Sequence, residues 1–177
     1  MTRRGTAGTP VLVDTDGGLD DVVALRALAA TGRLWGVTST WGNVSAPAAA
    51  RNASLAVPTV PVWSGAKRPP PRWRPSAVHG HDGLGDSTTV AQRIYRPTLT
   101  PEPSEVMIEF ARSEPSGVLL CIGPLTNLAT ALTRTAAVHS CVACRSWCPA
   151  ESASADHRWT RGSATPTPGT THKRLRP

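Results

Sequence analysis

Residues 11–21 read Val-Leu-Val-Asp-Thr-Asp-Gly-Gly-Leu-Asp-Asp, and this stretch decides the fold. Its first three residues are apolar and typical of a buried strand, whereas a helical pattern of apolar residues begins where it ends. The stretch therefore predicts a junction between a strand and a helix. Four carboxylates lie at that junction, those of Asp14, Asp16, Asp20 and Asp21.

These clustered carboxylates need an explanation, because they repel one another and cost free energy to desolvate. A divalent cation would relieve the repulsion, and oxygen ligands suit Ca²⁺ or Mg²⁺. Alternatively, the acidic residues stabilise the helix N-terminus, where negative charge is favourable. That alternative accounts for Asp20 and Asp21 but leaves Asp14 and Asp16 unexplained. The pattern therefore favours a cation-binding or catalytic site.

Strand-like and helix-like segments alternate onward from this junction. The pattern predicts strands over residues 10–16, 34–41, 60–63 and 117–122, and helices over residues 20–31, 45–57, 102–112 and from 124 onward. Such alternation is typical of an α/β fold, with an open, largely parallel sheet and flanking helices. Residues 67–86 interrupt it with prolines and then with glycines and two histidines, and long loops of this kind are often functional.

The composition changes at residue 138. The chain has 177 residues and a formal net charge of +7, and beyond residue 137 Ile, Leu, Val and Phe become rare. We expect a partial domain over residues 10–137 and a low-complexity basic tail over residues 138–177. The tail is expected to be disordered, or to be translated from a shifted reading frame, and not to complete the sheet. Its scattered charges make nucleic-acid binding unlikely, and its cysteines lack the usual zinc-site spacing.

The chain contains no apolar run long enough for a membrane span and no signal-peptide pattern. We therefore expect a cytoplasmic protein.

Four motifs together resemble the inosine/uridine-preferring nucleoside hydrolases. They are the acidic stretch at residues 14–21, Trp-Gly-Asn at 41–43, His-Gly-His-Asp-Gly-Leu-Gly at 79–85 and Ile-Gly-Pro-Leu-Thr-Asn-Leu-Ala at 122–129. The resemblance covers only the N-terminal half of such proteins, and the motifs of their second half are not recognisable here. Gly17 stands where the family usually has proline. The fold implied is Rossmann-like but incomplete, with the site at the carboxyl ends of the strands.

The resemblance implies a Ca²⁺-assisted glycosidase that hydrolyses the N-glycosidic bond of ribonucleosides to free base and ribose, as in purine or pyrimidine salvage. Asp16 would be the catalytic base, and Asp16, Asp21 and the backbone carbonyl of Ile122 would hold the metal. Asp14, Asp20, Asn43 and His79 would bind substrate. Asn127 is expected to hold the start of the last helix through local hydrogen bonds.

Homo-oligomerisation is possible, and the chain looks truncated. The alternative is therefore a non-catalytic remnant or a binding module with a basic tail.

Overall fold

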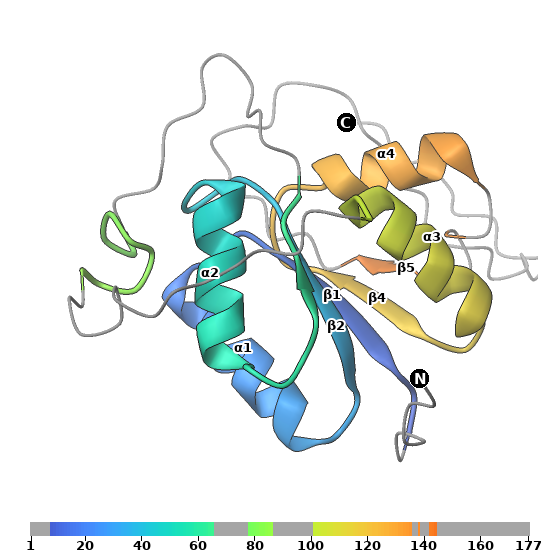
Figure 1. Cartoon of the computed structure of the whole chain (residues 1–177), viewed down its shortest axis with the longest axis horizontal. Coiled ribbons are helices and arrows are strands. Elements are labelled where there is room, and N and C mark those ends of the chain that lie inside the picture. The colour runs from blue at the N-terminus through green and yellow to red at the C-terminus, as the bar shows by residue number, and fades with distance from the viewer. Residues whose placement is uncertain (1–7, 66–77, 87–100, 136–137, 139–141, 145–177) are drawn as a thin grey trace, which may run out of the picture. The chain divides into compact units, whose positions relative to one another are not determined.

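The computed structural model describes residues 8–65, 78–86, 101–135, 138 and 142–144, which all belong to one unit. Strands and helices alternate along them (Figure 1). The elements are β1 (Val11–Thr15), α1 (Leu19–Ala30), β2 (Leu34–Ser39), α2 (Ala46–Ala56), β3 (Val62–Trp63), α3 (Pro103–Ser113), β4 (Val118–Cys121), α4 (Thr126–Arg134) and β5 (Val142–Cys144). This order confirms the predicted α/β fold.

The five strands form one sheet in the order β3-β2-β1-β4-β5, and each neighbouring pair is parallel. From the central strand β1, the chain adds β2 and β3 on one side and then returns to place β4 on the other. The connections that follow β1 and β4 therefore diverge. Open α/β sheets bind ligands at such a switch point, at the carboxyl ends of the strands.

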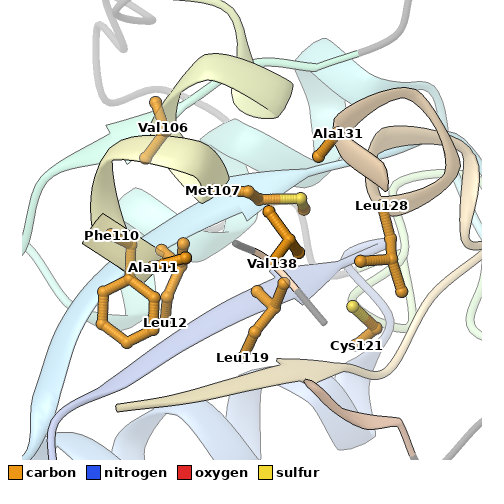
Figure 2. Close-up of a cluster of buried hydrophobic side chains, with 10 residues drawn as sticks. All are labelled: Leu12, Val106, Met107, Phe110, Ala111, Leu119, Cys121, Leu128, Ala131 and Val138. Atoms are coloured by element: carbon orange, nitrogen blue, oxygen red, sulfur yellow. The ribbon is translucent and has the colours of Figure 1, made fainter. Parts of the chain in front are cut away.

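Helices cover both faces of the sheet, so β1 is buried on both sides. Leu12 packs under α3 and α4 with Phe110, Met107 and Leu128 (Figure 2). Val11 and Val13 point to the opposite face, where they belong to the cluster that includes α1 and α2. A strand buried on both faces is apolar throughout instead of alternating, which explains the run Val-Leu-Val. This packing fixes the strand whose end carries Asp14 and Asp16.

Two details differ from the sequence-based expectations. α4 begins at Thr126, so Pro124 lies in the turn before the helix and not in its first position. Beyond residue 137, β5 pairs with β4, and Val138 is buried in the α3–α4 cluster. The expectation that this segment would not complete the sheet is therefore wrong. A strand of three residues is joined to its neighbour by backbone hydrogen bonds, so its composition carries little signal.

The domain boundary at residue 138 stays a prediction, and the tail from residue 145 lies outside the described residues. Among the helices described, none is both long and apolar enough to span a membrane.

Candidate functional site

The carboxylates of residues 14–21, the acidic turn, differ sharply in exposure. Asp14, Asp16 and Asp21 are buried, whereas the side chain of Asp20 is 74% exposed. Desolvating each buried carboxylate costs free energy and opposes folding. Capping of a surface helix alone does not explain why three carboxylates are buried. The turn therefore has the character of a binding site.

Asp14 lies near the end of the central strand, and only one of its two carboxylate oxygens accepts hydrogen bonds. Its Oδ1 accepts hydrogen bonds from Thr38 Oγ1 at 2.7 Å and from Asn127 Nδ2 at 2.9 Å. Its Oδ2 is buried without a hydrogen-bond partner. Burial raises the pKa of this carboxyl to about 7, although the bonds from Asn127 and Thr38 oppose the rise. A buried, unsatisfied oxygen is one that a cation or a donor from a ligand would stabilise.

Both carboxylate oxygens of Asp16 accept hydrogen bonds from Asn43, in the loop after β2. The backbone N–H of Asn43 donates to Asp16 Oδ2 at 2.9 Å, and its Nδ2 donates to Oδ1 at 3.0 Å. Glycine is required at the neighbouring position, because a Cβ atom on Gly42 would collide with the carboxylate. A Cβ atom on Gly123, after β4, would lie 2.9 Å from the backbone nitrogen of Asp16. Asp16 thus sits between the loops that follow β2 and β4.

Asp21 combines a helix-capping role with a contact to Asp16. Its Oδ2 accepts hydrogen bonds from Thr15 Oγ1 at 2.9 Å and from the backbone N–H of Gly18 at 3.0 Å, at the start of α1. Burial, followed by a hydrogen bond with Asp16 and the charge of Asp16, raises the pKa of Asp21 to about 8. The charge of Asp16 therefore disfavours ionisation of Asp21, and a divalent cation between the two carboxylates would relieve this repulsion.

Residues 78–86, the histidine loop, lie against the acidic turn. His79 Nε2 is 3.6 Å from Asp20 Oδ1, and a Cβ atom on Gly18 would lie 3.3 Å from His79 Cδ2. His81 is exposed. Of the two histidines in the motif, the structure brings His79 to the acidic turn.

Ile122 directly follows β4 and lies beside Asp14. Its backbone N–H donates to the Asp14 carbonyl at 2.9 Å. The structure thus brings together the predicted site residues Asp14, Asp16, Asp21, Asn43 and Ile122 at one end of the sheet, with Asp20 and His79 at its rim. Their roles stay predictions.

Two side chains that hold Asp14 were not predicted to do so. Asn127 Nδ2 donates to Asp14 Oδ1 and to the Ser39 carbonyl, the latter at 2.8 Å, and α4 has no side-chain cap bond. These two bonds reach β1 and β2, and the expected local bonds at the helix start stay a prediction. The bond from Asn127 to Asp14 spans 113 residues, which local sequence cannot reveal. Thr38 is opposite Asp14 where β1 pairs with β2. The predicted parallel sheet could therefore have indicated that Thr38 lies beside Asp14.

No complete metal centre is preformed by side chains in the described part of the chain. Within it, no group of three or more His, Cys, Asp or Glu side chains is arranged to hold a metal ion. The Asp16–Asp21 pair offers two carboxylates, so a bound cation would need further oxygen ligands from backbone, water or substrate.

The sequence and the fold of this chain are similar to those of known proteins. Residues 11–147 match the family model described as inosine-uridine preferring nucleoside hydrolase. Uridine nucleosidase 1 of Arabidopsis thaliana is 36% identical over 135 residues, covering 70% of this chain and 40% of that protein. A non-specific ribonucleoside hydrolase of Klebsiella pneumoniae is 31% identical over 133 residues, and the alignment covers 71% of this chain and 43% of that protein.

A solved plant nucleoside hydrolase aligns with a TM-score of 0.66 and 27% identity, covering 76% of this chain and 45% of the other. The chain therefore spans less than half the length of these relatives.

Proposed function

Because the chain belongs to the inosine-uridine preferring nucleoside hydrolase family, we propose that it hydrolyses the N-glycosidic bond of ribonucleosides to free base and ribose. The observation that carries the proposal is the position of the Asp16 carboxylate and its hydrogen bonds. This carboxylate is buried at the switch point of the sheet, both of its oxygens are fixed by Asn43, and it lies beside a second carboxylate, that of Asp21.

In this proposal Asp16 is the general base. Each carboxylate oxygen can accept more than one hydrogen bond, so the two bonds from Asn43 orient the group without exhausting its capacity. Asp16 would take a proton from water as the water oxygen forms a bond to C1′ of the ribose. The base would leave with the electron pair of the broken C–N bond. Positive charge that develops on the ribose is stabilised by nearby carboxylates.

The family implies a metal ion, and we propose that it is Ca²⁺. Asp16, Asp21 and the Ile122 carbonyl would hold it, and all three offer the oxygen atoms that Ca²⁺ prefers. Two observations support this assignment: Asp14 Oδ2 is buried without a hydrogen-bond partner, and the Asp21 carboxyl lies against the charge of Asp16, which a cation would offset. A bound Ca²⁺ lowers the pKa of a ligated water and binds hydroxyl oxygens.

Asn43, Asp20 and His79 are proposed to bind substrate. Asn43 lies beside Asp16 and would contact the ribose, Asp20 is exposed at the rim, and His79 would lie near the base. Asp14 is fully buried behind the turn. We therefore expect it to support the cation-binding side, where its charge acts without direct contact to the ribose.

The test is release of base and ribose by the purified full chain. Inosine and uridine are incubated with the chain in CaCl₂ or EDTA, and free base is quantified by chromatography and ribose by a reducing-sugar assay. We expect turnover that requires Ca²⁺ and is lost in Asp16→Asn. Glu109→Gln is the matched control, since it makes the same change on the exposed side of α3.

Two negative results together would overturn the proposal. If neither nucleoside is cleaved in Ca²⁺ and Ca²⁺ does not raise the melting temperature, the chain does not form the proposed site. It would then be the non-catalytic remnant of the alternative hypothesis.

A further inference from the structure

Asn52 is a buried amide on a face of α2 that otherwise packs alanines. Its neighbours Ala49, Ala50 and Ala53 are buried, and Asn52 itself is fully inaccessible. A buried amide requires hydrogen-bond partners, because leaving its groups unpaired costs about 1–3 kcal/mol each. The partners of Asn52 therefore indicate why an amide is present in this apolar layer.

The two acceptors of the Asn52 amide N–H groups are backbone carbonyls in distant loops. Asn52 Nδ2 donates to the Gly17 carbonyl at 2.9 Å and to the Asp82 carbonyl at 2.8 Å. Since an amide NH₂ group has two hydrogens, these two bonds use its whole donor capacity. Arg51 Nη2 donates to the Asn52 Oδ1 at 3.2 Å. The first carbonyl belongs to the acidic turn and the second to the histidine loop.

The two loops are in contact at this point. A Cβ atom on Gly83 would lie 2.7 Å from the Gly17 carbonyl oxygen and 2.9 Å from Asn52 Nδ2. A side chain at residue 83 would therefore separate the loops. Gly83 also has a φ of +79°, which favours glycine.

The histidine loop is otherwise folded on itself. The backbone N–H of Gly85 donates to the His79 carbonyl at 2.8 Å, and Asp82 Oδ1 accepts from the N–H groups of Leu84 at 2.7 Å and of Asp86 at 2.9 Å. These bonds connect residues 79–86 into one unit. The hydrogen bond from Asn52 to the Asp82 carbonyl therefore positions the whole loop, including His79.

We propose that Asn52 is a positioning residue that couples the histidine loop to the acidic turn. It contacts neither the Asp16 carboxylate nor, in the proposed function on which this inference rests, the substrate. Its role is to seat the loop so that His79 lies above Gly18 and beside Asp20. Loss of Asn52 should therefore weaken nucleoside binding while leaving the base, Asp16, in place.

The first test needs no activity. Amide hydrogen exchange is measured by NMR in the full chain for wild type, Asn52→Leu, Asn52→Asp and Asn52→Gln. Leucine removes both N–H donors of the amide. Aspartate places a carboxylate, which is an acceptor, against the Gly17 and Asp82 carbonyls. Glutamine retains an NH₂ donor group. Because so short a loop keeps its internal hydrogen bonds only while it is docked, we expect the Gly85 amide to exchange at least about tenfold faster in the first two variants, with partial rescue in glutamine.

The amide of Ile122, bonded to Asp14 between β1 and β4, is the internal control. Its exchange should stay within about twofold of wild type. An unchanged Gly85 amide, or equal acceleration of the Gly85 and Ile122 amides, would overturn the proposal. The second result would show that Asn52 only stabilises the fold.

The second test uses turnover of inosine or uridine. Asn52→Leu should raise KM about tenfold or more and change kcat less than about threefold, since Asn43 still holds Asp16. A fall in kcat with unchanged KM would contradict the positioning role. If wild type is inactive, hydrogen exchange alone decides whether Asn52 couples the loops.

Discussion

The acidic turn and the histidine loop lie side by side but are held in different ways. In the turn, Asp14 and Asp16 accept hydrogen bonds from residues that follow or belong to β2 and α4. In the loop, Asp82 and Asp86 accept bonds from the loop's own backbone. A site held by the sheet changes only when the fold changes, whereas a loop joined to the domain through Asn52 can be displaced while the sheet stays folded. Changes in the turn should therefore alter chemistry and stability, and changes in the loop should alter binding.

The largest effect should follow from Asp16→Asn in the turn. Loss of a general base lowers rates by about 10²–10⁴-fold, and here one proposed metal charge is lost as well. We expect kcat to fall at least 10³-fold while the far-ultraviolet circular dichroism spectrum is retained. His79→Gln in the loop should instead act mainly on KM. Retained turnover in Asp16→Asn would contradict the assigned role.

The metal-free chain should lose stability as pH rises. Folding raises the pKa of Asp14 to about 7 and of Asp21 to about 8, from an ordinary 3.8. The folded state therefore binds these protons more tightly, so the stabilisation is complete below about pH 4 and is lost as pH rises through 7 to 8. For Asp14 alone the loss amounts to at most about 4 kcal/mol.

Urea denaturation in EDTA between pH 5 and 9 measures this loss. Asp14→Asn should flatten the profile, because the amide has no proton to lose, and Ca²⁺ should reduce the fall at high pH. A flat profile for wild type would show that the turn does not store the unfavourable charge inferred from its burial.

A smaller effect should follow from Gly17→Ala. Gly17 has a φ of +77°, and a Cβ atom there would lie 2.5 Å from the Ala49 Cα. Backbone strain and the collision with α2 should together lower the free energy of unfolding by about 3 kcal/mol. Gly32 has a similar φ of +70° with open space around it. Gly32→Ala should therefore cost only about 1 kcal/mol, and equal losses in urea denaturation would refute the packing argument.

The smallest effect should follow from Asp20→Asn at the rim. The Asp20 side chain is 74% exposed and its contact with His79 is 3.6 Å, so solvent screens the pair. We expect the melting temperature to change by less than about 1 °C, with a measurable rise in KM if Asp20 binds ribose. A large loss of stability would mean that the loop is held through this pair and not through Asn52.

The sequence predicts most of this fold because each strand is an apolar run that ends in polar or glycine residues. Residues 10–16 and 117–122 were predicted as strands, and β1 and β4 lie within them. The acidic turn was found for the same reason, since its residues are contiguous. Asn52 and Asn127 were not predicted as parts of the site, because their partners are far away in sequence and only the strand order brings them together. β5 was missed because its three residues carry no periodicity.

The strand order also determines when the site can form. Asp14 belongs to the first strand, but it is covered by Asn127 and bonded through its carbonyl to Ile122, more than a hundred residues later. Closing such a long loop is entropically costly and slow compared with local helix formation. At a synthesis rate of about 5–20 residues per second, the acidic turn leaves the ribosome seconds before the strand that buries it. We therefore expect the Asp14 carboxylate to stay exposed to water until β4 pairs with β1.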